Sequence, residues 1–325
     1  MRISVIIPTY RRVEDLKRCL RSLNDQIRKA DEIIVVVRDI DRETQLFLEN
    51  FEYIYGVYNT IIVNIPGQVH ALNQGIEQAT GDIISITDDD GAPWPDWLKN
   101  VEEHFIRDAR VGGVGGKDWL HNNFVLETGK RDTVGKIQWF GRVIGNHHLG
   151  HGTFREVDLL KGVNMSFRAN AIKNIRFDER LMGNGAQVHN DMAFCLEVKR
   201  AGWKLIYDPN VALNHYLAER HDEDKRNQSF NYDANCNAVH NETLVLLEHL
   251  SKNVRVFFLV WAVLIGTRSS WGVAQLVRFY SKEKKLAILK FNSSIKGRRN
   301  GWRTWKNSNM LNKRGVISEN VNINN

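Results

Sequence analysis

Residues 71–98 read ALNQGIEQATGDIISITDDDGAPWPDWL, and this stretch decides the fold class. Its apolar residues first recur at helical spacing up to Gly81, and then form the unbroken run Ile83–Ile86. Such a short apolar run indicates a buried strand. Three carboxylates follow the strand almost at once: Asp88, Asp89 and Asp90. The stretch therefore predicts a helix, a buried strand and an acidic strand end, in that order.

The same alternation extends toward the N-terminus. Apolar, mostly β-branched runs predict strands at residues 3–7, 33–37 and 61–65, and apolar residues at helical spacing predict helices at residues 13–23 and 69–79. Strands that alternate with helices indicate a parallel sheet covered on both faces. Ligands of such sheets bind beyond the carboxyl ends of the strands. The first candidates for a site are therefore the residues that follow each strand: Pro8, Thr9, Tyr10 and Arg11, then Arg38 and Asp39, then Asp88 to Asp90.

The second half of the chain has a weaker pattern. Residues 111–152 are rich in Gly, His and Trp, which predicts loops and short strands around a pocket. A helix is expected over residues 190–201, because Gly202 follows its apolar positions. A further strand is expected over residues 205–207, ended by Asp208 and Pro209.

Composition excludes several classes of protein. The 325 residues are 42% hydrophobic and 26% charged, as in an ordinary globular chain. The three cysteines are far apart, which excludes a disulfide scaffold and a thiolate zinc site. Residues 267–325 hold 13 Lys/Arg and two Asp/Glu, whereas the first 266 residues hold 32 and 36. A near-neutral body with a basic tail predicts an anionic surface as a partner, either lipid or nucleic acid.

The C-terminal third predicts helices that lie on a membrane. Residues 254–266 form an apolar run of 13 residues, shorter than the roughly 20 residues that a spanning helix needs. Tryptophans among basic residues are typical of interfacial helices. Those tryptophans are Trp261, Trp271, Trp302 and Trp305. The alternative is a core helix of the globular domain. From residue 307 the chain is polar and is expected to be disordered.

The acidic strand end predicts a metal site. Adjacent carboxylates repel one another unless a positive charge lies between them. Hard oxygen ligands suit Mg²⁺ or Mn²⁺, which keep waters and also bind phosphate oxygens. Alternate residues of an extended segment share a side, so Asp88 and Asp90 are expected to converge while Asp89 points away. The alternative is an acidic turn that merely ends the strand.

Several segments together resemble the glycosyltransferases of family 2. They are VIIPTYRR, EIIVVVRD, the stretch quoted above, GVNMSFRANAI and NDMAFCLEVKRAGWKLIYDPNVALNH, in that order between Met1 and His215. The resemblance implies the GT-A fold, an α/β fold with a mixed, mainly parallel sheet. It also implies transfer of a sugar from a nucleotide sugar, with inversion at the anomeric carbon and with Mn²⁺ or Mg²⁺ as cofactor.

The resemblance also implies roles for individual residues. Asp191 matches the base that deprotonates the acceptor, and Asn190 stands where the family usually has Glu. Arg38 stands where the family often has a second Asp at the base. The residues expected to bind the nucleotide and donor are Pro8, Thr9, Arg11, Asp39, Asp88 and Asp89. The expected metal ligands are Asp90 and His215. The expected acceptor and donor-sugar pocket comprises Trp119, Asn164, Met165, Ser166 and Asn190.

These observations lead to one expectation with two alternatives. The chain is expected to be a cytoplasmic transferase at the inner face of a membrane, moving a sugar from a UDP-sugar to a glycan or lipid-linked acceptor, with no nucleic acid as partner. Its expected domains are a GT-A domain over residues 1–240, a helical membrane-interface extension over residues 241–306 and a disordered tail over residues 307–325. One alternative is a phosphatase of the haloacid dehalogenase type, because Asp88 to Gly91 resembles its DxDG motif. The other is a non-catalytic module that binds membrane or nucleic acid.

Overall fold

The computed structural model describes residues 1–122, 125–225 and 230–322, without the side chains of residues 311–322. The strands are β1 Ile3–Thr9, β2 Glu32–Arg38, β3 Val57–Val63, β4 Ile83–Ile86, β5 Gly91–Pro93, β6 Val111–Asn122, β7 Val125–Leu126, β8 Lys136–Ile137, β9 Val143–Ile144, β10 Arg155–Val157, β11 Met165–Arg168 and β12 Lys204–Tyr216. The helices are α1 Val13–Asn24, α2 Arg42–Glu49, α3 Gln68–Gln78, α4 Trp97–Arg107, α5 Asn190–Arg200, α6 Tyr232–His249, α7 Lys252–Leu264, α8 Val273–Glu283 and α9 Lys285–Asn322, with the short 3-10 turns η1 His147–Leu149 and η2 Ala169–Ile172.

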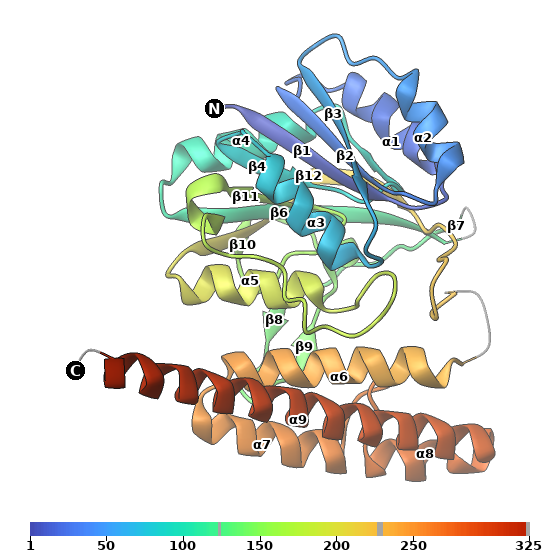
Figure 1. Ribbon diagram of the computed structural model, residues 1–325. Helices are drawn as coiled ribbons and strands as arrows, with labels where there is room; N and C mark the ends of the chain where they lie inside the picture. Colours follow the sequence, from blue (N-terminus) through green and yellow to red (C-terminus); the bar gives the residue numbers. More distant parts are fainter. Residues whose placement is uncertain (123–124, 226–229, 323–325) are drawn as a thin grey trace.

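A mixed, mainly parallel sheet forms the centre of the molecule (Figure 1). Its order is β10-β12-β6-β11-β4-β1-β2-β3. Strands β3, β2, β1 and β4 are parallel to one another, and β12 is parallel to β6. Strand β11 lies antiparallel between β4 and β6. The predicted α/β fold with a mixed, mainly parallel sheet is therefore confirmed.

Helices cover both faces of this sheet, so each face has its own hydrophobic cluster. Buried residues of α1 and α4 pack on one face, and buried residues of α3, α5 and α6 pack on the other. The strand side chains alternate between the clusters: Ile6 belongs to the second, and Val5 and Ile7 belong to the first. Since the sheet is buried on both faces, its exposed chemistry is concentrated at the ends of its strands.

The C-terminal helices form a separate layer below α5 in Figure 1. Helix α6 spans position 240, the expected domain boundary, and shares a hydrophobic cluster with α5. Helices α7 and α8 form the outermost layer, on the side away from the sheet. Of the helices described, none combines the length and apolarity needed to cross a bilayer. Helix α9 includes residues 307–322, where the sequence predicts disorder, and residues 323–325 of that tail lie outside the described residues.

The sequence patterns locate most strands but misjudge some boundaries. The third strand is β3, which ends at Val63 instead of residue 65. Strand β12 continues past Asp208 and Pro209 to Tyr216, because a register shift after Asp208 accommodates the proline in the strand. Residues 111–122 form one long strand, β6, whose glycines permit close packing. At Gly116, for example, an added Cβ would collide with the carbonyl oxygen of Val211.

Candidate active site

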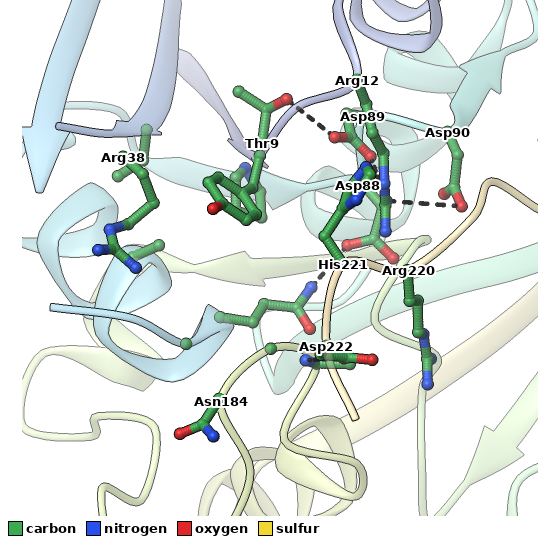
Figure 2. A pocket seen from close by; sticks show the side chains of 18 of the residues that line it. Thr9, Arg12, Arg38, Asp88, Asp89, Asp90, Asn184, Arg220, His221 and Asp222 are labelled. Carbon is green, nitrogen blue, oxygen red and sulfur yellow. Dashed lines mark hydrogen bonds and ion pairs between the residues drawn. The ribbon is translucent and has the colours of Figure 1, made fainter. Parts of the chain in front are cut away.

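A cleft lies beyond the carboxyl ends of β1, β2 and β4, with about 840 Å³ of space that is free of atoms and partly open to solvent. Figure 2 shows side chains from three strand ends converging on it. The residues lining it include Pro8, Thr9, Tyr10, Arg12, Arg38, Gln68, Asp88, Asp89, Asp90, Asn184, Arg220, His221 and Asp222.

Asp89 lies at the buried centre of the acidic strand end. Its carboxylate accepts a 2.8 Å hydrogen bond from Thr9 Oγ1 and one of the same length from Arg12 Nη1 (Figure 2). Burial raises the pKa of Asp89 to about 6, although Arg12 opposes that shift. Burial works against the charge of Arg12, but Asp89 and Asp90 outweigh it and raise the pKa of the guanidinium. Asp89 therefore faces Thr9 and Arg12, partners different from those of Asp88 and Asp90, and connects the end of the first strand to the segment after the fourth.

Asp88 is connected to the start of helix α5. Gln68, at the start of α3, donates from Nε2 to Asp88 Oδ1 over 2.8 Å. The side-chain oxygen of Gln68 accepts in turn from Asn190 Nδ2 over 3.3 Å. Asn190 also donates to the carbonyl oxygen of Ala186 over 2.7 Å, which fixes its amide. Asn190 therefore connects the acidic cleft to the residue beside it, Asp191.

Asp90 and His215 are the first two members of a buried series of charged groups. Asp90 is 1% exposed and His215 3%, and Asp90 Oδ1 lies 3.4 Å from His215 Nε2. The other imidazole nitrogen, Nδ1, lies 3.4 Å from Asp118 Oδ2. The Lys161 ammonium lies 2.5 Å from the same Asp118 oxygen. Four groups from different elements thus form the order Asp90, His215, Asp118, Lys161.

The electrostatics of this series favour positive charge beside Asp90. Burial raises the cost of ionising Asp118, but Lys161 and His215 outweigh it and lower the pKa of that carboxyl. Burial likewise opposes charge on His215, yet its contacts with the carboxylates of Asp118 and Asp90 raise the pKa of the imidazole. The two carboxylates therefore stabilise a cation at His215, whether a proton or a metal.

The donor atoms at Asp90 and His215 suit a divalent metal. Nε2 of His215 is buried and makes no hydrogen bond of ordinary geometry within the described residues. Its second nitrogen faces the carboxylate of Asp118, the arrangement that commonly orients a metal-binding histidine. No three His, Cys, Asp or Glu side chains in the described ranges are grouped as a complete metal site. Mg²⁺ and Mn²⁺ typically take one or two protein ligands and complete their shells with phosphate oxygens and water.

Asp191 lies in the first turn of α5 and contacts the loop that contains Lys161 and Gly162. Its Oδ2 accepts from the backbone N–H of Gly162 over 3.1 Å. The Lys161 side chain thus contacts Asp118, and the backbone N–H of the next residue, Gly162, contacts Asp191. Asp191 is not among the residues that line the cleft in the described chain. It is connected to the acidic strand end through the neighbouring Asn190 and through this loop.

The end of the cleft near β2 contains Arg38 instead of Asp39. Arg38 lines the cleft and its guanidinium lies 5.9 Å from the centroid of the Tyr10 ring. Asp39 is more exposed and accepts from Arg38 Nη2 over 3.4 Å. Arg11, with a φ of 57°, is exposed, and its backbone N–H donates to Asp41. Arg12, the next residue, is the one that enters the site.

Four residues expected to line the sugar pocket are not among those that line this cleft: Trp119, Asn164, Met165 and Ser166. Asn164 is 1% exposed, accepts from Trp97 Nε1 over 2.9 Å and donates to the carbonyl of Val211 over 2.8 Å. Met165 and Ser166 are buried in β11, where Ser166 donates to Ser85 over 2.9 Å. These contacts serve the core. Trp119 stacks on Trp94 with ring centroids 5.8 Å apart and lies outside the cleft lining.

Sequence reasoning missed several residues of this site, among them Arg12, Gln68, Asp118 and Lys161. Gln68 begins α3 five residues after β3 ends at Val63, whereas Thr9 is the last residue of β1. Arg12 directly follows Arg11, the residue that was expected to bind the nucleotide. Asp118 and Lys161 had no sequence signal, since only the pairing of β6 with β12 brings Asp118 to His215.

Comparisons with known proteins agree with this architecture. A family model described as glycosyltransferase like family 2 matches residues 1–238. A glucosyl-dolichyl phosphate glucuronosyltransferase of Haloferax volcanii is 24% identical over 231 residues, which are 67% of this chain and 70% of that protein. TarS 1–349 of S. aureus, solved with UDP-GlcNAc, is similar in fold with a TM-score of 0.55 at 17% identity, over 95% of this chain and 92% of that one. The mannosyltransferase PcManGT of Pyrobaculum calidifontis, solved with GDP-Man and Mn²⁺, gives a TM-score of 0.55 at 16% identity, over 96% and 88%.

Proposed function

This chain belongs to glycosyltransferase family 2, and on that premise we propose that it transfers a sugar, with inversion, from a nucleoside diphosphate sugar to a glycan or lipid-linked acceptor. The observation that carries the proposal is the acidic edge of the cleft. Asp88, Asp89 and Asp90 end one strand, and each faces a group from a different element. An edge built in this way is suited to a phosphorylated ligand together with a cation.

We propose that Asp90 and His215 hold a divalent metal, Mn²⁺ or Mg²⁺. When bound, such an ion would stabilise the negative charge that develops on a diphosphate leaving group. The chain's own residues keep the two ligands in place: Asp118 orients His215, and Lys161 holds Asp118 ionised. Arg12 neutralises Asp89 and lies 4.0 Å from Asp90.

The proposed general base is Asp191. Inverting transfer needs one carboxylate that takes a proton from the acceptor hydroxyl, and it needs no protein nucleophile. Asp191 lies in the first turn of α5, near the positive end of the helix dipole. The Gly162 N–H holds one carboxylate oxygen. The proton of the acceptor would then pass to a carboxylate whose position is fixed before substrate arrives.

The donor is proposed to be a UDP-sugar, with Pro8, Thr9, Asp88 and Asp89 around the nucleotide. Arg38 offers a hydrogen-bond donor at the base end of the cleft, and the adjacent Asp39, which accepts from Arg38 outside the cleft lining, offers an acceptor. Uracil and guanine each carry hydrogen-bond donors and acceptors along their edges, so this end of the cleft is compatible with either base. Support for a lipid-linked acceptor comes from the Haloferax volcanii relative, whose name specifies a glucosyl-dolichyl phosphate.

We further propose that the first 240 residues, approximately, act as the transferase domain and that the helices after them hold it at the cytoplasmic face of a membrane. The family membership leaves the phosphatase alternative without support. Nucleic acid is not proposed as a partner.

A screen of nucleotide sugars tests the proposed function. The purified chain is incubated with UDP- and GDP-sugars with and without Mn²⁺, and release of nucleotide and thermal stability are measured. One donor class is expected to raise the melting temperature by mass action, and only with metal present. If no nucleotide sugar stabilises or is turned over by the folded protein, the proposal is wrong.

A further inference from the structure

We propose that α7, α8 and the hairpin β8–β9 together form one surface that docks on an anionic lipid bilayer. The inference deepens the membrane association proposed above and rests on it. Its apolar face lies in the run 254–266 that the sequence suggested, but it does not depend on the tryptophans expected there. Trp271 is buried, and Trp261 and Trp305 are partly buried against the core.

The exposed apolar side chains lie on one face of α7. Val256, Phe257, Val260, Val263 and Leu264 recur at the spacing of one helical face and are all exposed, Phe257 by 58%. The opposite face packs inward through Phe258 and Ala262, both fully buried. The helix therefore has a complete inner contact and still presents a second apolar face to solvent. Exposed apolar area of this extent marks an interaction surface.

Two neighbouring elements extend this face. Val273, Val277 and Tyr280 are exposed at helical spacing on α8, which contacts α7 in the outermost layer (Figure 1). Trp139, in the turn between β8 and β9, is 70% exposed, and its ring lies 5.9 Å from that of Phe257. Since Trp139 comes from the first half of the chain, the surface joins the catalytic region to the C-terminal helices.

The positive charge around this apolar face favours an anionic partner. Residues 252–290 hold eight Lys/Arg and one Glu, Glu283, which pairs with Lys290. Arg268, Arg278, Lys282, Lys284 and Lys285 are exposed. Apolar side chains within a basic rim are typical of helices that lie in the plane of an anionic membrane. A symmetric dimer would bring the basic rim against itself, and a nucleic acid duplex presents mainly its phosphate backbone, not a continuous apolar surface, to Phe257 and Val260.

Vesicle flotation with the full chain tests the docking surface. The probes are vesicles of phosphatidylcholine alone and vesicles in which about a third of the lipid is phosphatidylglycerol. The wild-type chain is expected to bind the anionic vesicles at least tenfold more tightly. Each basic residue near the surface contributes about 1 kcal/mol, so Arg278→Glu combined with Lys282→Glu is expected to weaken binding by about 30-fold or more.

Apolar variants and a matched control locate the contact. Phe257→Ser combined with Val260→Ser is expected to weaken vesicle binding at least tenfold, and Trp139→Ser at least threefold. Ile106→Ser removes an equally exposed apolar residue, 69% exposed on α4, and is expected to change nothing. Nucleotide binding, measured in parallel on every variant, is expected to be unchanged, so a failure of the docking surface is distinguishable from a failure of the proposed function.

Three results would overturn the docking surface. One is that the folded wild-type chain does not bind anionic vesicles. Another is that the α7 or Trp139 variants bind as the wild type does. The third is a stable dimer in solution that Phe257→Ser with Val260→Ser dissociates, because the face would then be a subunit interface.

Discussion

The cleft and the outer helical layer differ in how their charges are arranged. The cleft concentrates buried carboxylates, and each is held by one or two short contacts to a cation or an amide. The outer layer concentrates exposed cations and exposed apolar side chains. A fixed set of charges suits a reaction that needs one geometry, whereas an exposed set suits a fluid surface that has none.

The difference predicts how each region responds to mutation. A single change in the cleft removes a charge that several neighbours depend on, so its effect is large and local. A single change in the outer layer removes one of many similar contacts. The following tests begin where the largest effect is expected.

Replacing Asp191 by Asn is expected to lower the transfer rate by about 10³-fold, within the range of a lost general base. Donor binding is expected to persist, because Asp191 does not line the cleft. The measurement is a steady-state rate with the donor identified by the screen, together with donor affinity. Glu197→Gln, on the same helix but paired with Arg200, is the control and is expected to stay active. A fully active Asp191→Asn variant would show that another group is the base.

Replacing Lys161 by Met is expected to weaken Mn²⁺ binding by about 10- to 100-fold, as for other groups that orient a metal ligand. Without Lys161, Asp118 loses its closest cation and no longer fixes His215. Manganese affinity is read from electron paramagnetic resonance of the free ion. Lys136→Met removes an ammonium 3.7 Å from Asp158 in a half-exposed pair and serves as the control. Equal affinities in the two variants would mean that the Lys161 contact is purely structural.

Replacing Arg38 by Ala is expected to raise the donor KM by about tenfold with little change in kcat. Arg38 lies at the end of the cleft away from the carboxylates, so it contributes to binding and not to the chemical step. Such a pattern is that of an interaction made equally in the ground and transition states. A fall in kcat with an unchanged KM would place Arg38 at the reacting end instead.

His249 tests the junction between the regions through stability instead of activity. Burial lowers the pKa of His249 to about 4, so the folded protein disfavours its protonation. The unfolded chain takes up that proton near its usual pKa of about 6.5, and stability is therefore lost as the pH falls from about 6.5 toward 4. At pH 5 the loss is about 2 kcal/mol, which His249→Gln is expected to remove. Melting temperatures at pH 7 and pH 5 measure it, and an equal acid shift in both proteins would contradict the assignment.

The sequence predicted those parts of the site that depend on residues close together in the chain. The three strand ends that carry Thr9, Arg38 and Asp90 were visible as apolar runs followed by polar residues, and parallel strands bring such ends together. The fold class followed from the same alternation. Family 2 membership, expected from the motifs, is confirmed by the family match.

The rest depends on contacts between distant parts of the chain. Asp118 and His215 meet because β12 continues through Pro209, a residue that ended the strand in the sequence pattern. Asn164 occurs in a family motif, yet its hydrogen bonds to Trp97 and Val211 give it a structural place in the core. The tryptophans of the C-terminal third similarly failed to mark the exposed face, because composition does not reveal which side of a helix packs inward.

The most direct test of the account measures manganese and nucleotide together. The central claim is that Asp90 and His215 hold a divalent cation beside a nucleoside diphosphate. Thermal unfolding of the wild-type chain is followed with Mn²⁺ alone, with UDP or GDP alone, and with both. The account predicts that one nucleotide with Mn²⁺ stabilises far more than either ligand alone, and that Asp90→Asn abolishes the difference. Equal stabilisation without the metal, or an Asp90→Asn variant that responds as the wild type does, would contradict it.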